Sequence, residues 1–296
     1  MTVSHLFTGP RALVLGLFFV LMAGAASASP LNGPAYYGDD FYSRVQGRMR
    51  DQQLVDELRK ILVSMHEKTG NGGADRIVSH CDAAARGCYG HTPIGYGPAR
   101  RVIMGQLYLE DYNGQPGIEE VYCQRDFTKD DFRSAPYPGP GNIPDNTILN
   151  VEHTWPQSRF NSRMNRDTQK CDLHHLFPSH SQMNSIRGNK KFGEVDRPAF
   201  ALPCPISKMG SIQGRSGDYF EPPAAHKGNV ARALFYFSVR YSIAIDSEEE
   251  AFLKRWNQMD PVDQEEKDRN DQIQRIQGNR NPFVDFPEMA DQISNF

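Results

Sequence analysis

A short stretch of the chain, residues 148–189, narrowly restricts what the protein can fold into. Apolar residues in Ile148–Glu152 predict a short strand that reaches His153, and Pro156 prevents that strand from continuing as a central strand of a sheet. A loop with room for a second short strand follows, and Pro178–Arg187 is predicted to be a helix. The sequence therefore predicts a small ββα unit.

The ββα unit gathers residue types that can hold a metal ion and move a proton. Four of the nine histidines of the chain lie in or beside it. Glu152 and Asn184 offer hard oxygen ligands, which suit magnesium or calcium and leave other coordination positions to water and to phosphate. His153 is not needed as a ligand, so its neutral imidazole can take a proton from water. A metal ion held there would stabilise the charge that develops on the leaving O3′ oxygen.

Positive charge is concentrated around the same unit, although the formal net charge of the chain is −3. Between Arg159 and Lys191, seven basic side chains outnumber the two acidic ones, Asp167 and Asp172. A basic patch beside candidate catalytic residues focuses the electric field on an anionic substrate. Charge alone is equally compatible with a solvated charged face of no catalytic importance.

Two motifs, "NVEHTWPQS" and "DLHHLFPSHSQMNSIRGN", resemble the paired signature of the endonuclease I family. These are secreted and periplasmic nucleases of the ββα-metal, or His-Me finger, superfamily. Segments such as "YGPARRVIMGQLYLED" and "KGNVARALFYFSVRY" are also similar to family segments, so the resemblance extends along most of the chain that follows the leader. By motif, His153 matches the general base, Glu152 the first metal ligand and Asn184 the second.

The resemblance implies cleavage of DNA, and often RNA, with little sequence preference and with 5′-phosphate products. One Mg²⁺ ion is the implied cofactor, and Ca²⁺ or Mn²⁺ are expected to replace it in binding. A site built from a metal, a histidine and arginines recognises phosphate, which carries no sequence information. We therefore expect the backbone of DNA and RNA to be the partner of a monomeric enzyme.

Further candidate residues come from the basic side chains and the remaining histidines. Arg163 and Arg187 are candidates for stabilising the reacting phosphate, and spacing does not choose among the three arginines between the two motifs. If the chain is extended at His174 and His175, their side chains point to opposite faces, so at most one of them faces the site. The candidates for substrate binding are Arg159, Arg166, His174, His175, Lys190 and Arg280.

The first 28 residues predict a signal peptide. Arg11 precedes an apolar run, Ala12–Met22, and the segment ends in the small-residue cleavage signal Ala26–Ala28. A signal anchor is the alternative. Cleavage after Ala28 would leave a single nuclease domain, residues 29–296, with no further membrane-crossing segment. We therefore expect an exported protein, periplasmic or extracellular.

The five cysteines fit an oxidising compartment, where disulfides form. Cys81 and Cys88 are the pair predicted to be bridged, because the loop between them is short. A second bridge and one odd thiol are expected, with the pairing left open. Scattered cysteines without a C-x-x-C pair make a metal-thiolate site the weaker alternative.

The hydrophobic pattern elsewhere predicts the α+β class, as one mixed domain in which helices surround a small antiparallel sheet. Residues 41–68 predict a helix, 72–98 a loop, and 101–109 a strand that pairs beyond Asn113-Gly114 in a hairpin. Residues 136–144 form a Pro/Gly linker. Residues 229–245 predict another helix, and two further helices are closed by Gly278.

Two other classes of function remain open from the sequence. A zinc hydrolase acting on peptides could use His153, His174 and His175, but the H-E-x-x-H spacing is absent. An exported, disulfide-stabilised scaffold or nucleic-acid-binding protein without catalysis is the non-enzyme alternative.

Overall fold

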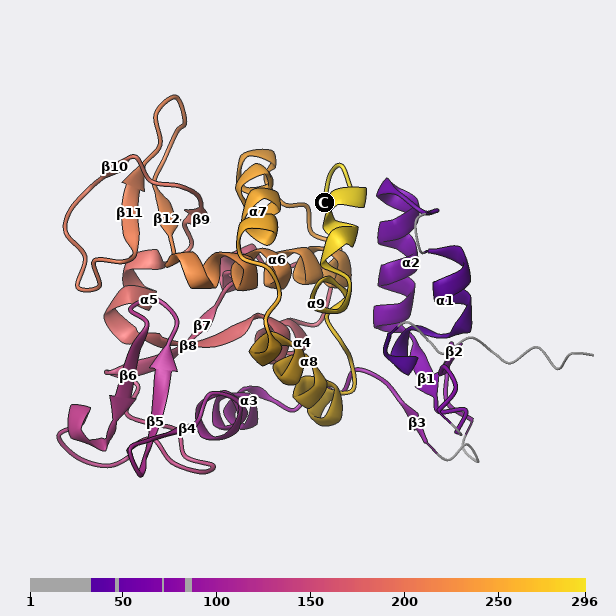
Figure 1. The fold of residues 1–296 in the computed structure, drawn as a ribbon, viewed down its shortest axis with the longest axis horizontal. Helices are drawn as coiled ribbons and strands as arrows, with labels where there is room; N and C mark the ends of the chain where they lie inside the picture. The colour runs from indigo at the N-terminus through magenta and orange to yellow at the C-terminus, as the bar shows by residue number, and fades with distance from the viewer. Residues whose placement is uncertain (1–32, 46–47, 71, 83–86) are drawn as a thin grey trace, which may run out of the picture. The chain divides into compact units, whose positions relative to one another are not determined.

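Helices and small sheets are mixed along the whole described chain, which confirms the predicted α+β class (Figure 1). The computed structural model describes residues 33–45, 48–70, 72–82 and 87–296. The predicted signal peptide therefore lies outside the described residues. Residues Leu31–Phe296 form one compact unit. No helix in the described ranges is both long enough and apolar enough to cross a membrane.

The helices cluster at the two ends of the chain, with shorter ones between. They are α1 (Asp39–Arg44), α2 (Asp51–Val63), α3 (Tyr96–Val102), α4 (Arg166–Cys171), α5 (Ser181–Arg187), α6 (Lys227–Tyr241), α7 (Ser247–Met259), α8 (Gln264–Gln277) and α9 (Pro282–Asp285). Three short helical turns differ from an α-helix in their hydrogen-bond spacing. They are the π-helical η2 (Ile103–Leu107) and the 3₁₀ turns η5 (Leu173–His175) and η6 (Ala224–His226).

The strands form four small sheets in the described ranges, where the sequence predicted one. The strands are β1 (Met65–Glu67), β2 (Arg76–Val78), β3 (Cys88–Tyr89), β4 (Glu110–Tyr112), β5 (Gln115–Glu120), β6 (Arg125–Thr128), β7 (Leu149–His153), β8 (Leu176–His180), β9 (Lys191–Phe192), β10 (Arg197–Pro198), β11 (Lys208–Ser211) and β12 (Tyr219–Glu221). The sheet orders are β2-β1-β3, β4-β5-β6, β7-β8 and β10-β11-β12-β9. Among the described strands, β12 and β9 alone pair in parallel.

Helix α6 forms the centre of the main hydrophobic core, and thirteen of its fifteen residues are buried. The helix predicted at 229–245 is thus confirmed as Lys227–Tyr241, and even its polar side chains are buried. Arg232 and Tyr236 are among them, and each has a hydrogen-bonding partner. Arg232 pairs with Glu266, and the Tyr236 hydroxyl donates to Asp172 at 2.7 Å.

The helix predicted over residues 41–68 is divided in the structure. It consists of α1 and α2, and the last predicted turn is instead strand β1, which pairs with both β2 and β3. Asp51, at the start of α2, has a positive φ of 52°, a backbone conformation that a continuous helix cannot contain. The predicted loop 72–98 supplies the two partner strands and the start of α3.

The strand predicted over residues 101–109 is wrong. These residues complete α3 and continue into the π-helical turn η2. Ile103 and Met104 are buried there against the second core cluster, so tertiary packing overrides the apparent alternation. The predicted hairpin itself is present: β4 and β5 join at Asn113-Gly114, both of which have positive φ.

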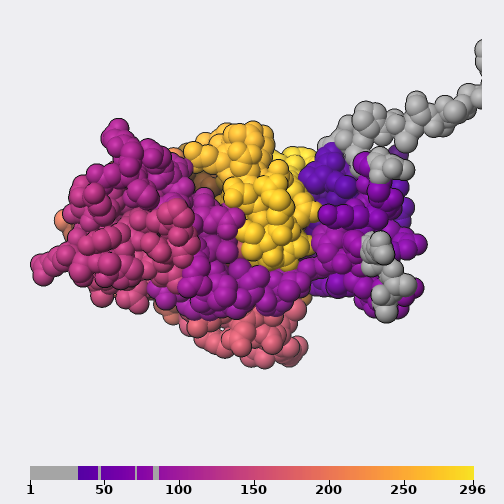
Figure 2. Space-filling model, turned by 90° about the horizontal axis from the view of Figure 1, so that it is seen from below, coloured from indigo at the N-terminus to yellow at the C-terminus, as the bar shows by residue number. Residues whose placement is uncertain are grey.

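The other predicted boundaries are largely confirmed. Helices α7 and α8 are the two expected near the end of the chain, and Gly278, with φ of 86°, caps α8. The indigo segment that contains α1 lies beside the yellow C-terminal residues (Figure 2), where Phe41 packs on Phe286. The predicted bridge Cys81–Cys88 is present, and Cys123–Cys204 is the second, which leaves Cys171 as a buried free thiol.

Candidate active site

The antiparallel ribbon β7-β8 and helix α5 form the predicted ββα unit (Figure 1). The ribbon pairs Glu152 with Phe177 and His153 with Leu176. The helix predicted from residue 178 begins at Ser181, because Leu176–His180 is the second strand. Both strands are buried along most of their length, so the end of β7 is held rigidly.

His153 is the last residue of β7, and only 7% of it is exposed. Its Nε2 atom lies 3.0 Å from the carbonyl oxygen of Lys170. A carbonyl can only accept, so Nε2 carries the proton and Nδ1 of the neutral ring keeps its lone pair. Burial, assisted by the nearby His175, lowers the pKa of His153 to about 3. The ring is therefore neutral near pH 7 and has a nitrogen ready to accept a proton.

Glu152 is 1% exposed, and its Oε1 atom accepts two hydrogen bonds. Oε1 accepts hydrogen bonds from the Tyr122 hydroxyl at 2.9 Å and from Arg187 Nη1 at 2.7 Å. Burial raises the pKa of the carboxyl group, and Arg187 and Tyr122 oppose that rise. Because neither neighbour bonds to Oε2, one oxygen of Glu152 is left for a further ligand.

Asn184 lies on α5 and is half-buried beside the same strand. Its Nδ2 atom donates to the carbonyl oxygen of Val151 at 3.2 Å, so the amide lies next to the residue that precedes Glu152. The amide oxygen makes no hydrogen bond to a described residue. Glu152 and Asn184 thus each retain one oxygen without an intramolecular partner, and such hard oxygen donors fit a magnesium or calcium ion.

Arg187 does not occupy the position that the sequence predicted for it. The guanidinium is 1% exposed and bonds to Glu152, to the His153 carbonyl at 2.8 Å and to the Thr154 carbonyl at 2.5 Å. Because the guanidinium is buried among these partners, it is not accessible to a substrate phosphate. Arg187 is a positioning residue for Glu152 and for the backbone of β7, and its assignment as a phosphate ligand is corrected.

His174 and His175 are also corrected, because both are buried scaffold residues. They are 1% and 0% exposed and belong to η5, where the chain is not extended. His174 Nε2 lies 3.2 Å from the Asn279 carbonyl and His175 Nε2 lies 2.8 Å from the Gln169 carbonyl. Burial lowers their pKa values to about 3 and about 4. Both rings are buried away from the surface, and each donates through Nε2 to a backbone carbonyl. Among the described residues, His153, His174 and His175 do not form a group that could hold a metal ion, which argues against the zinc peptidase alternative.

Some basic side chains near the site are bonded within the protein, and others are not. Arg159 bonds to Glu249 at 2.9 Å, Arg166 bonds to Gln157, and Lys190 caps the end of α5 through the Ile186 carbonyl. Arg163 is exposed, and its guanidinium makes no hydrogen bond or ion pair within the part of the chain that the structure describes. Of the three arginines between the motifs, the geometry therefore favours Arg163 for contact with a phosphate.

Arg280, predicted to contact the substrate backbone, is instead a buried structural residue. It is 5% exposed and donates to Asp285 and Asp271, with the shortest contacts at 2.6 Å. These two carboxylates satisfy its charge inside the protein. The substrate-binding assignment of Arg280 is therefore corrected.

Three residues of the site were not singled out from the sequence. Tyr122 supports Glu152, the Lys170 carbonyl orients His153, and the half-buried Tyr96 ring lies 5.4 Å from the imidazole of His153. Glu152 also contributes to the raised pKa of Tyr96, after burial, which is the larger cause. Tyr96 lies in a segment that resembles the family, but the contacts of Tyr96 and Tyr122 depend on tertiary structure.

Comparison with known proteins agrees with this geometry. The endonuclease I family model matches residues 110–288. The extracellular ribonuclease of Bacillus subtilis (strain 168) is 36% identical over 173 residues, which cover 52% of this chain and 55% of that protein. An extracellular deoxyribonuclease of Aeromonas hydrophila is 29% identical over 115 residues, or 38% of this chain and 48% of that protein.

A periplasmic deoxyribonuclease of Aeromonas hydrophila is 28% identical over 115 residues, which cover 38% of this chain and 47% of that protein. The chain thus spans about half the length of these curated relatives. The family match includes β7, β8, α5 and all the residues that surround Glu152 and His153 except Tyr96. On this match, the chain belongs to the endonuclease I family.

Proposed function

We propose that the protein is an exported, metal-dependent endonuclease that hydrolyses the phosphodiester bonds of DNA and RNA with little sequence preference. The observation that carries the proposal is the neutral, oriented imidazole of His153 beside the carboxylate of Glu152. The matched relatives include proteins named ribonuclease and deoxyribonuclease, which supports both nucleic acids as substrates. Their extracellular and periplasmic names, with the two disulfides of this chain, support a place outside the cytoplasm.

His153 would act as the general base. Its Nδ1 atom accepts a proton from a water molecule, the water oxygen attacks phosphorus, and the bond between phosphorus and O3′ breaks. The O3′ oxygen takes a proton from solvent, and the phosphate stays on the 5′ oxygen of the downstream fragment. The Lys170 carbonyl fixes the reactive tautomer by holding the proton on Nε2.

Glu152 and Asn184 would hold one divalent metal ion, Mg²⁺, which Ca²⁺ or Mn²⁺ could replace in binding. When bound, the ion supplies Lewis-acid stabilisation of charge on the phosphate and on the leaving oxygen. Arg187 and Tyr122 fix the orientation of the Glu152 carboxylate from behind. Arg163, with a free and exposed guanidinium, would bind a phosphate oxygen of the substrate.

The experiment that tests the proposal uses supercoiled plasmid and total RNA, with magnesium or with a chelator. We expect magnesium-dependent cleavage of both by the wild type, and loss of cleavage in His153→Ala and Asn184→Ala. The exposed His80 provides the control, since His80→Ala leaves the site intact. Equal activity of His153→Ala and wild type would overturn the proposal. A folded wild type without activity on either substrate would favour the non-catalytic binding protein.

A further inference from the structure

Helix α3 lies beside the end of β7, and the family match, which begins at residue 110, does not include it. Its buried residue Ala99 belongs to the second core cluster together with Cys171, the last residue of α4. Tyr96 and Arg100 are four positions apart in α3, so they lie on the same face of the helix. The Tyr96 ring centroid is 5.4 Å from that of the His153 imidazole. Helix α3 therefore places two polar side chains beside the candidate base.

The hydroxyl of Tyr96 is available as a hydrogen-bond donor. The side chain is half-buried, and its hydroxyl makes no hydrogen bond to a described residue and is not enclosed by protein. Burial raises the pKa of Tyr96, while Arg100 opposes this rise and Glu152 adds to it. The hydroxyl is therefore protonated near pH 7 and lies within electrostatic range of both charged groups. A protonated phenol can donate a hydrogen bond to an anionic oxygen.

Two cationic side chains lie beside Tyr96. The Nζ atom of Lys170 is 4.4 Å from the centroid of the Tyr96 ring, a distance typical of a cation–π contact. Arg100 lies on the same helix face as Tyr96 and acts on its hydroxyl electrostatically. Within the described ranges, neither cation forms an ion pair or a hydrogen bond, and their terminal nitrogens are not buried. Unlike Arg159 and Arg166, both cations can therefore bind an external anion.

Lys170 connects these side chains to the candidate base. Its carbonyl oxygen lies 3.0 Å from Nε2 of His153. Its ammonium group contributes to the lowered pKa of His153, after burial and the nearby His175, which are the larger causes. The side chain of Lys170 is thus close to both the imidazole and the Tyr96 ring. An anion bound by this ammonium group would lie beside a substrate strand held at His153.

The scissile phosphate itself occupies a different place. In the reaction proposed above, it lies between Nδ1 of His153 and the ligand oxygens of Glu152 and Asn184. The Tyr96 ring fills the space beside the imidazole, so the polar groups around this ring meet a neighbouring phosphate of the same strand. Phosphate contacts of this kind fix the register of a nucleic acid without reading its sequence.

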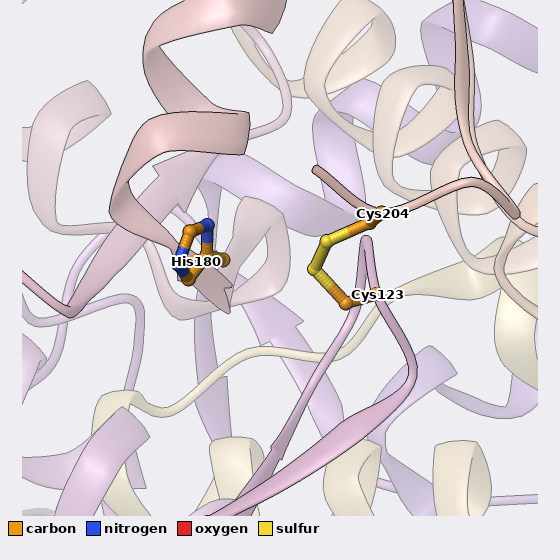
Figure 3. Close-up of side chains that lie close together, drawn as sticks. All are labelled: Cys123, His180 and Cys204. Atoms are coloured by element: carbon orange, nitrogen blue, oxygen red, sulfur yellow. A yellow bond between two sulfur atoms is a disulfide. The ribbon is translucent and has the colours of Figure 1, made fainter. Parts of the chain in front are cut away.

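A second metal ion is the alternative means of binding phosphate in a nuclease. It would require several ligand atoms close to one another. In the described part of the chain, the one group of three His, Cys, Asp or Glu ligand atoms within 4.8 Å of one another is Cys123, His180 and Cys204. Figure 3 shows that the two cysteines there are joined in a disulfide, and none of the three belongs to α3 or α4. The residues around Tyr96 therefore favour direct binding of phosphate by protein cations.

We propose that Tyr96, Arg100 and Lys170 form a subsite for the phosphate next to the scissile one in the nucleic-acid strand. The guanidinium and ammonium groups neutralise this phosphate, and the Tyr96 hydroxyl donates one hydrogen bond to it. The subsite rests on the proposed nuclease function for its substrate. Its three side chains position the strand, and none of them takes part in bond cleavage.

Fluorescence anisotropy of a short labelled DNA duplex tests the subsite, with the full chain, a chelator and a series of salt concentrations. In Arg100→Gln/Lys170→Gln the affinity should fall about tenfold. The slope of log affinity against log salt should decrease in magnitude by about 0.9, the value for one lost phosphate contact. Tyr96→Phe should weaken binding about fivefold without a change of slope, because it removes a hydrogen bond but no charge. The matched control Arg48→Gln/Arg50→Gln removes the same charge from exposed positions between α1 and α2 and should bind as the wild type does.

Three results would overturn the subsite. The first is an absence of DNA binding to the folded wild type, since the subsite needs no metal ion. The second is an unchanged affinity and slope in the double variant of α3 and α4. The third is an equal loss in the control variant, which would show a general attraction between DNA and basic side chains. Because the assay requires no cleavage, a wild type that binds DNA as expected but cleaves no substrate would refute the proposed function and still support the subsite. Circular dichroism of each variant confirms that it is folded.

Discussion

Mild acid should destabilise the protein strongly, because four histidines with strongly lowered pKa values are buried in their neutral form. His153, His174, His175 and His226 are 7%, 1%, 0% and 4% exposed. Burial lowers their pKa values to about 3, about 3, about 4 and about 3. In the unfolded chain each imidazole returns to a pKa of about 6.5. Below that pH the unfolded state binds more protons than the native state, so the free energy of unfolding falls as the pH falls.

The magnitude follows from the width of that pH window. At pH 5, protonation stabilises the unfolded state by about 2 kcal/mol for each histidine, or about 8 kcal/mol for the four. This is comparable with the total stability of a typical domain, about 5–15 kcal/mol. Asp172 does not add to the loss above pH 5. Although burial opposes it, His91 and His174 hold the pKa of the Asp172 carboxyl well below its usual range.

Urea unfolding at pH 8.0, 6.5, 5.5 and 5.0 measures the effect, with the fluorescence of the two buried tryptophans, Trp155 and Trp256, as the signal. We expect little change from pH 8 to 6.5 and a steep loss below it. His226→Gln should remove about a quarter of the loss, and replacement of the exposed His80 should remove none. A free energy of unfolding that changes by less than about 1 kcal/mol between pH 8 and 5 would refute the reasoning.

Three further predictions concern the groups around the end of β7. Arg187→Ala leaves the buried charge of Glu152 unpaired and should cost about 3–5 kcal/mol of stability in chemical unfolding, and a cost below about 1 kcal/mol would contradict the buried pair. Tyr122→Phe removes a support of Glu152 and should raise the Mg²⁺ concentration for half-maximal cleavage about tenfold; an unchanged requirement would show that the hydroxyl is dispensable. Arg163→Ala should slow plasmid cleavage about 100-fold without loss of stability, whereas Arg166→Ala, whose guanidinium is bonded within the protein, should cleave nearly as the wild type does; equal rates would assign phosphate binding elsewhere.

Local chemistry made part of the fold predictable. Pro156 marks the end of the first strand, Asn113-Gly114 the hairpin and Gly278 the end of a helix, because each residue restricts its own backbone. The secondary structure of residues 101–109 could not be predicted from such residues. Their apolar positions are compatible with a strand, and only the packing of Ile103 and its neighbours selects the helical alternative.

The sequence predicted which residues gather at the candidate site but not how their side chains are oriented. His153, Glu152 and Asn184 lie together around the end of β7, on one ribbon and one short helix. Arg187 and Arg280 resemble phosphate ligands in the sequence, yet the structure buries both against carboxylates. A charge pattern cannot distinguish these cases, because burial of an arginine depends on an acidic partner that is distant in the sequence or on the other side of a turn.

The short helix α4 orients two neighbouring imidazole rings, those of His153 and His175, in the same way. The last carbonyl groups of a helix lack partners within it, and imidazole N–H groups satisfy two of them here. The Gln169 carbonyl accepts from His175, and the Lys170 carbonyl accepts from His153. Both rings are therefore held in the same tautomer, with the proton on Nε2. The Nδ1 atom of His175 is buried without a partner, but His153 lies at the end of the strand beside the half-buried Tyr96. The position of the ring relative to the end of β7, and not its chemistry, separates the candidate base from the scaffold.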